Sequence, residues 1–174
     1  MKQSILHIAL LAGVLGGCAS TPRFLPNTEE AAVAIETAIR LEAQKPEGEL
    51  VVTDLEKVAS LTLFRKQITD LTPLTGLKGL KYLYLSDNKI AGVASLTALT
   101  RLEFLHLYKN QVKDPAPMST LKGLKSLNLS RNQITNLSSL ADLKKLKKLY
   151  LGNNQITDLT PLSGMKGLAE LYLS

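Results

Sequence analysis

The sequence repeats with a period of 22 residues from Val58 onward, and this period constrains the fold more than any other feature. Numbering each unit from Val58 and its equivalents, apolar residues recur at positions one, four, six and eleven, and asparagine recurs at position nine. The pattern L-x-x-L-x-L-x-x-N-x-[IV] is complete in four units. Repetition of this kind predicts a stacked array of identical supersecondary units. Position four is Leu61, Leu83, Leu105, Leu127, Leu149 and Leu171, and position six is Leu63, Leu85, Leu107, Leu129, Leu151 and Leu173.

The first half of each unit is predicted to be a short strand. Side chains alternate along a strand, so positions four and six face the same side and stack with their equivalents in neighbouring units into one core. The asparagine follows the strand, where the chain turns inward, and its amide can both donate to and accept from exposed backbone groups. We therefore expect a ladder formed by Asn88, Asn110, Asn132 and Asn154, with Lys66 at this position in the first unit.

The second half of each unit returns to the start of the next strand. Pro73, Pro117 and Pro161 argue for 3₁₀ turns or irregular pieces there, because proline interrupts a longer helix. Acidic or amide side chains recur at position thirteen, and we expect them to cap these turns. Calcium binding by this row is the alternative, although calcium repeats carry denser acids and glycines. The row consists of Asp70, Asp114, Asn136 and Asp158.

A helical cap is predicted over residues 27–57, ahead of repeats that occupy residues 58–174 as five full units and a partial sixth. Asn27 is a candidate N-cap, with Glu30 three residues later, and this helix is expected to end by about Lys45. A second small capping box, from Thr53 to Glu56, predicts another helical turn. A cap is expected because a stacked array exposes an apolar end.

These units, with N-x-I-x-D-L-x-P-L-x-x-L-x-x-L in the fifth copy, resemble the short 22-residue leucine-rich repeats of internalins and of a phosphatase-regulatory subunit. The segment from Lys45 to Gly48 also resembles the cap region of the bacterial members. The resemblance covers about residues 45–174. It implies an α/β fold, namely a curved leucine-rich-repeat solenoid with a parallel sheet on its concave side, and it implies protein binding as the usual function.

The N-terminus carries a different signal. Lys2 precedes an almost wholly apolar run from Ile5 to Leu15, which is too short to span a membrane but suits a secretory signal. The following Leu15-Gly16-Gly17-Cys18 resembles the lipobox of a bacterial lipoprotein. The resemblance implies a signal peptide at 1–17, lipid on Cys18, a tether at 18–26 and, with Ala19 after the cysteine, the outer membrane in a Gram-negative cell. An ordinary signal peptide or an apolar N-terminal helix is the alternative.

Positions three, five and seven of each strand point away from the leucine core and line what we call the sheet face, expected to be concave. All five tyrosines and two of the three phenylalanines lie there. Aromatic clusters are typical of protein-binding hot spots, although aromatic residues also have a high propensity for strands without any role in binding. The expected partner-binding residues are Phe64, Tyr82, Tyr84, Phe104, His106, Tyr108, Tyr150 and Tyr172, with Arg65, Lys109 and Arg131 as a basic rim.

Catalysis is not predicted, because G-x-S-x-G, H-E-x-x-H and phosphate-loop motifs are absent from the sequence. His106 has no second histidine or thiol partner once the signal is removed, so it is expected to be a surface histidine. We expect no cofactor and no metal. The favoured function is a lipid-anchored protein-binding module of the cell envelope. A structural lipoprotein without a specific partner is the alternative, and glycan binding by the aromatic face is a variant of the first.

The net charge of +6 is too mild to indicate nucleic acid binding. Several lysines lie where a unit turns, among them Lys144, Lys145, Lys147 and Lys148. This position favours a solvent-exposed face without a specific role, and attraction to an anionic membrane is the more specific alternative. The sixth unit stops at Ser174, just after its strand. Either the chain is a fragment or another subunit covers the last strand, so the oligomeric state stays open.

Overall fold

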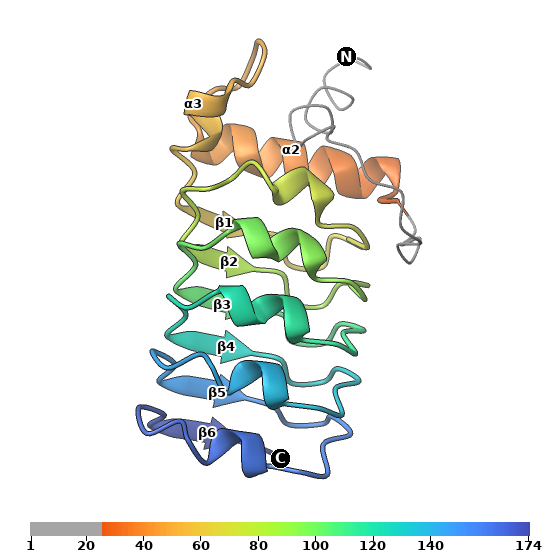
Figure 1. Ribbon diagram of the computed structural model, residues 1–174. Coiled ribbons are helices and arrows are strands. Elements are labelled where there is room, and N and C mark those ends of the chain that lie inside the picture. Colours follow the sequence, from red (N-terminus) through yellow and green to blue (C-terminus); the bar gives the residue numbers. More distant parts are fainter. Residues whose placement is uncertain (1–25) are drawn as a thin grey trace, which may run out of the picture.

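The computed structural model describes residues 26–174 and contains one six-stranded sheet (Figure 1). All neighbouring strands are parallel, and each residue pairs with the residue 22 positions later, as Leu61 does with Leu83. The order follows the chain, which confirms the predicted solenoid of stacked strands. The strands are β1 (Ser60–Thr62), β2 (Tyr82–Tyr84), β3 (Phe104–His106), β4 (Ser126–Asn128), β5 (Lys148–Tyr150) and β6 (Glu170–Tyr172).

The core lies between the sheet and the return segments. Leu83, Leu105 and Leu127, at position four, are fully buried, as are the leucines at position six from β1 to β4. The fully buried leucines and isoleucines of successive repeats form one continuous cluster. Each buried leucine contributes roughly 1.5–3 kcal/mol relative to an exposed one, so this stack supplies most of the drive to fold.

The asparagines at position nine join neighbouring repeats. The amide oxygen of Asn132 accepts from the backbone N–H of Val112 at 2.9 Å, one repeat earlier. Its amide nitrogen donates to the carbonyls of Leu107 and Leu129, both at 2.9 Å. Asn110 and Asn154 make the equivalent bonds. Asn88 also serves the first repeat, because it accepts from the N–H of Lys66.

The returns form short 3₁₀ helices on the side of the core opposite the strands (Figure 1). At position thirteen, a side-chain oxygen of Asp70, Asp114, Asn136 or Asp158 accepts the backbone N–H two residues later, at 2.8–2.9 Å. These bonds close a turn just before four of these 3₁₀ helices. The N-cap of each of the four helices is the following residue and makes no side-chain cap bond, so the expected capping position was wrong by one residue. The helices are η1 (Thr72–Leu74), η2 (Ala94–Ala98), η3 (Ala116–Thr120), η4 (Ser138–Leu140) and η5 (Thr160–Leu162).

Helix α2 (Glu29–Glu42) crosses the N-terminal end of the solenoid (Figure 1). It buries Ala31, Ile35 and Ile39 against the first repeat. Its N-cap is Thr28, and the prediction of Asn27 was wrong by one residue. The amide oxygen of Asn27 instead accepts from the N–H groups of Thr69 and Asp70, at 2.9 and 3.0 Å. Asn27 thus ties the cap to the first return. None of the helices within residues 26–174 is long and apolar enough to cross a membrane.

Helix α3 (Val52–Leu55) begins two residues earlier than a capping box at Thr53 would allow. Asp54, rather than Glu56, reaches back and accepts the backbone N–H of Val51 at 3.2 Å. The same carboxylate pairs with Lys45 at 2.7 Å and with Lys57 at 3.2 Å. The second capping-box prediction was therefore wrong in register, because the ion pairs to Asp54 fix where the helix starts.

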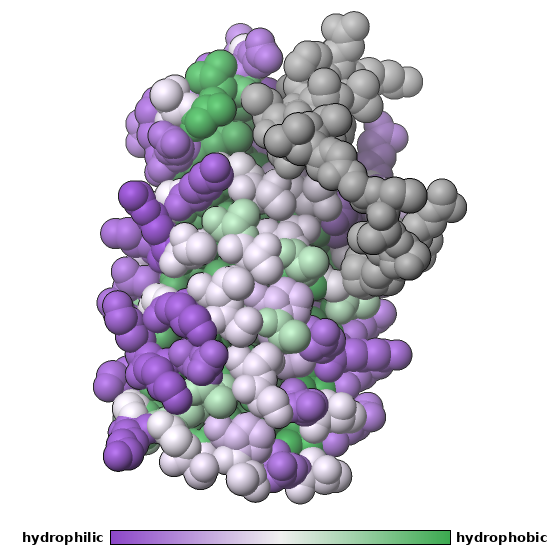
Figure 2. All heavy atoms as spheres, viewed as in Figure 1, coloured by the Kyte–Doolittle hydropathy of each residue, from purple (hydrophilic) through white to green (hydrophobic). Residues whose placement is uncertain are grey.

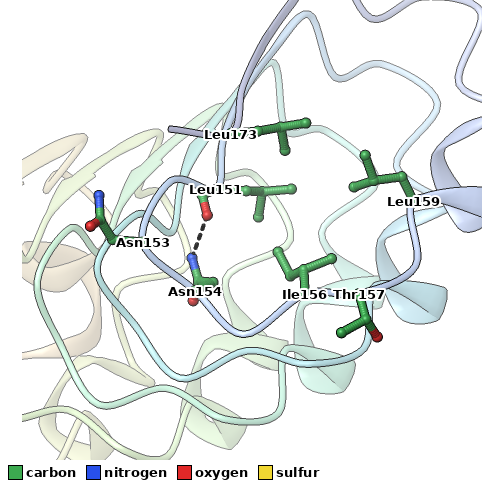
Figure 3. Close-up of a pocket in the computed structure, with 7 residues that line it drawn as sticks. All are labelled: Leu151, Asn153, Asn154, Ile156, Thr157, Leu159 and Leu173. Atoms are coloured by element: carbon green, nitrogen blue, oxygen red, sulfur yellow. Dashed lines mark hydrogen bonds between the residues drawn. The ribbon is translucent and has the colours of Figure 1, made fainter.

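At the opposite end of the solenoid, Leu171 and Leu173 of the last repeat are 40% and 45% exposed. A pocket of about 200 Å³ opens beside them, with apolar side chains pointing into it (Figure 3). The hydrogen bond from Asn154 to the carbonyl of Leu151, at 2.7 Å, forms part of its wall. In the inner repeats the next unit packs on these positions, so the pocket is a feature of the solenoid end. Its lining is Leu151, Asn153, Asn154, Ile156, Thr157, Leu159 and Leu173.

Candidate functional site: the sheet face

The strands β2 and β3 place their aromatic side chains next to one another on the sheet face. Parallel pairing sets Tyr82 beside Phe104 and Tyr84 beside His106. The rings of Tyr82 and Phe104 stack with centroids 5.0 Å apart and an interplanar angle of 16°. Tyr84 meets His106 edge-on, at 5.1 Å and 82°. We call the six residues Phe64, Tyr82, Tyr84, Phe104, His106 and Tyr108 the aromatic patch.

The aromatic patch is partly open to solvent. Phe64 is 47% exposed and Tyr82 36% exposed, whereas Leu83 between the two tyrosines of β2 is fully buried. The alternation of the strand therefore separates residues that hold the fold from residues that form a surface. The stacking between neighbouring strands restricts the rings, so little side-chain freedom remains to be lost when another molecule covers them.

Cationic side chains lie over the outer rings of the patch. The guanidinium of Arg65 is 4.8 Å from the ring centre of Phe64, and that of Arg131 is 5.7 Å from the ring centre of Tyr108. Both distances lie within the range of cation–π attraction. These contacts attach the rim at position eight to the aromatic patch.

The predicted basic rim is interrupted by an acid. Asp87 lies between Arg65 and Lys109 and pairs with them at 2.7 and 2.9 Å. Hydrogen bonds from Arg65 and then Lys109 lower the pKa of the Asp87 carboxyl. Sequence reasoning missed Asp87, although comparing position eight across all repeats would have revealed it. Every residue in this row has a left-handed backbone, with φ between 54° and 58°: Arg65, Asp87, Lys109, Arg131 and Asn153.

The remaining two aromatic residues form a separate pair. Tyr150 and Tyr172 stack at 4.5 Å and 4°, on β5 and β6. Strand β4 separates them from the aromatic patch, and its side chains on the sheet face are the smaller Ser126, Asn128 and Ser130. The eight residues expected to bind a partner therefore form two groups, the six residues of the aromatic patch and the pair of Tyr150 and Tyr172.

Charges accompany the second pair. Lys148 and Glu170 form an ion pair at 2.7 Å, and the hydroxyl of Tyr172 donates to Glu170 at 3.3 Å. The charge of Glu170 raises the pKa of Tyr172, and the hydrogen bond from Lys148 lowers the pKa of Glu170. This end of the sheet face is thus more polar than the aromatic patch.

His106 lies in the middle of the aromatic patch and is half-buried. Burial lowers the pKa of its imidazole and so favours the neutral ring. Its ring contact is with Tyr84. Within residues 26–174 no three acidic, histidine or cysteine side chains gather closely enough to hold a metal ion. Cys18, the expected lipidation site, lies outside the described residues.

Comparison with known proteins agrees with this architecture. Residues 100–142, 122–164 and 144–174 match the sequence profile of the family described as Leucine Rich repeats (2 copies). No curated protein matches the chain.

Solved structures that are similar to the chain include the following three. An internalin (inlF) from Listeria monocytogenes is 30% identical over 79% of this chain and 42% of its own, with a TM-score of 0.75. A leucine-rich-repeat protein of Leptospira interrogans is 31% identical over 70% of this chain and 33% of its own, with a TM-score of 0.61. A plant peptide hormone receptor in complex with RGF2 is 26% identical over 72% of this chain and 22% of its own, with a TM-score of 0.62.

The chain spans less than half the length of each of these three structures. The profile match, the internalin similarity and the register of six parallel strands agree with one another. The chain therefore folds as a leucine-rich-repeat solenoid similar to the internalins, and its residues 100–174 match the leucine-rich-repeat family profile.

Proposed function

We propose that this chain is a protein-binding module that captures its partner on the sheet face, with the aromatic patch as the principal contact. The observation that carries the proposal is the stacked, partly exposed pair of Tyr82 and Phe104 beside Tyr84 and His106. The core of the solenoid is built from leucine and does not use these rings. Tyrosine is among the residues enriched where interfaces concentrate their binding energy.

The known uses of the fold support this proposal. Leucine-rich-repeat proteins generally mediate protein–protein interactions, and the plant receptor similar to this chain was solved in complex with RGF2. The row at position eight adds charges of both signs beside the rings. Such charges at the edge of an interface select a partner of complementary charge and speed its approach.

The test is affinity capture from cell-envelope extracts of the source organism, with the full chain as bait. The variant Tyr84→Ala/Tyr108→Ala removes two rings of the aromatic patch, and Tyr150→Ala/Tyr172→Ala removes two rings of the separate pair. Both change the composition equally. We expect a specific partner to be lost with the first variant and kept with the second, while circular dichroism shows both to be folded. Capture that survives the first variant would contradict the proposal.

A lipid anchor on Cys18 is part of the same proposal. Its support is the lipobox-like Leu15-Gly16-Gly17-Cys18 after an apolar run, which would place the module in the cell envelope, at the outer membrane of a Gram-negative cell. Metabolic labelling with palmitate should mark the wild-type chain and leave a Cys18→Ser variant unlabelled. Labelling of that variant, or no labelling of either protein, would contradict a lipid anchor on Cys18.

The second candidate is a structural lipoprotein without a specific partner. It is favoured by the stacking itself, because ring pairs such as Tyr150 with Tyr172 also stabilise neighbouring strands. This candidate predicts that capture recovers only proteins shared by every variant. It also predicts that loss of Tyr84 and Tyr108 weakens the fold and changes nothing else.

A further inference from the structure

Basic side chains concentrate at the turns that lead into the strands. Positions 21, 22 and two of the successive repeats carry nine basic residues and a single acid, Glu103. All nine basic residues are exposed. We call them the basic edge: Lys78, Lys81, Arg101, Lys122, Lys125, Lys144, Lys145, Lys147 and Lys166.

The fold aligns these residues in rows along the solenoid. The backbone N–H of Glu103 donates to the carbonyl of Lys81, that of Lys125 to Glu103, and that of Lys147 to Lys125, at 2.8–2.9 Å. Equivalent residues of neighbouring repeats are therefore about 4.8 Å apart within a row, the spacing of paired strands. Figure 2, drawn from the same side as Figure 1, shows hydrophilic residues along both margins, including the left one, where the strands begin.

Most residues of the basic edge form no salt bridge in the part of the chain that the structure describes. Lys125 pairs with Glu103 at 2.5 Å, and Lys122 pairs with Asp142 at 3.3 Å. The other seven residues of the basic edge form no salt bridge within residues 26–174. The basic edge, with Glu103 counted, exceeds the net charge of +6 of the whole chain, so the rest of the chain is net negative. The basic edge therefore carries the excess positive charge of the chain.

The chemistry of the basic edge favours a surface with many dispersed negative charges. Eight of its nine residues are lysine, whose ammonium acts as a point charge, while arginine would be expected for bidentate recognition of a single phosphate. None of the three positions carries an aromatic residue, so no platform for stacking nucleobases is present at these positions. Clusters of four to eight lysines or arginines are typical of sites that bind anionic lipid.

We propose that the basic edge is a docking surface for a lipid bilayer with anionic headgroups. Docking in this way would lay the long axis of the solenoid along the membrane and leave the sheet face open beside it. The inference uses different residues from the aromatic patch and needs no lipid on Cys18, so it fails or survives separately from the proposed function.

The test is co-sedimentation of the full chain with vesicles, with Cys18→Ser in every protein so that no lipid is attached. Vesicles contain either phosphatidylcholine alone or phosphatidylcholine with phosphatidylglycerol. One variant carries Lys144→Gln, Lys145→Gln and Lys147→Gln. The matched control carries Lys66→Gln, Lys89→Gln and Lys113→Gln, which are exposed residues beyond the other end of the strands. Both variants lose three positive charges.

We expect the unmodified basic edge to favour the phosphatidylglycerol vesicles, and added salt to weaken that preference. The first variant should lose at least about tenfold in affinity for them, because each basic side chain near an anionic surface contributes on the order of 1 kcal/mol. The control should lose less than about threefold. Equal losses in the two variants, or no preference for anionic vesicles, would overturn the proposal. Tighter binding to a single-stranded oligonucleotide or to polyglutamate at the same salt would also overturn it.

Discussion

The amide oxygen of Asn110 accepts a hydrogen bond from the backbone N–H of Ile90 at 3.0 Å, across the boundary between two repeats. Its amide nitrogen donates to the carbonyls of Leu85 and Leu107, at 3.0 and 3.1 Å. One buried side chain therefore satisfies backbone groups in its own repeat and in the preceding one. The strand register and the turn geometry are coupled at this point, so the repeats stabilise one another.

The change Asn110→Ala is expected to lower the free energy of unfolding by about 2–4 kcal/mol, because it leaves several buried backbone groups without partners. Asn154→Ala is the matched control. Asn154 makes the same kinds of bond but is only half-buried, so water can replace part of what it supplies. Urea unfolding measures both variants. A loss for Asn154→Ala as large as that for Asn110→Ala would contradict this reading of the ladder.

Acid should weaken the N-terminal cap. Hydrogen bonds from Lys45, the backbone of Val51 and Lys57 lower the pKa of Asp54 from 3.8 to about 2. A group with a depressed pKa stabilises the fold fully above its unfolded pKa and loses that contribution as the pH falls through its folded pKa. We expect the urea midpoint to fall between about pH 4 and about pH 2, and to fall less steeply in Asp54→Asn. An equally steep fall in Asp54→Asn would rule out this role.

The cap should also be sensitive to a methyl group at Gly79. A Cβ at this position would collide with the backbone carbonyl oxygen of Glu56, at the end of α3. Gly79→Ala should therefore cost about 1–3 kcal/mol in the free energy of unfolding. Gly164→Ala is the control, because a Cβ there meets only the flexible end of Lys144, at 3.9 Å. Equal shifts of the unfolding temperature in the two variants would show that the cap moves away from the added methyl group at no measurable cost.

The left-handed row at position eight gives a further prediction. Lys109 has a φ of 55°, a conformation that asparagine tolerates and that a β-branched side chain does not. Lys109→Val should be less stable than Lys109→Asn by about 1–3 kcal/mol. Both variants lose the ion pair with Asp87, so their difference isolates the backbone term. Urea unfolding measures both variants. Equal free energies of unfolding would mean that the backbone of the turn adjusts to valine at no cost.

The features of the fold that could be predicted from the sequence are those formed by residues that recur every 22 positions. The register of Leu61 with Leu83 and the bonds of Asn88 follow from residues that repeat every 22 positions. The role of Asn27 was not predictable, because it bonds to Thr69, 42 residues away, and no repeated pattern links the two. The start of α3 was misplaced because it depends on the contacts of Asp54 with the Val51 backbone and with Lys45 and Lys57, which no repeated pattern specifies.

The candidate site was predictable as a list of residues and less so as a surface. Strand alternation identified which aromatic side chains share the sheet face. The division into two clusters follows from the small side chains of β4, such as Ser126, which could have been noticed in the sequence. The stacking of Tyr82 on Phe104 and the ion pair of Asp87 with Arg65 depend on side-chain rotamers, which the repeat pattern does not specify.

The central claim is that a partner protein binds the aromatic patch, and the dissociation constant of a captured partner tests it most directly. Loss of two hot-spot tyrosines costs about 2 kcal/mol or more for each, so Tyr84→Ala/Tyr108→Ala should weaken binding at least about a hundredfold. Tyr150→Ala/Tyr172→Ala should weaken it less than about tenfold, by about 1.4 kcal/mol at most. Equal dissociation constants for the two variants would show that the aromatic patch is not the binding site.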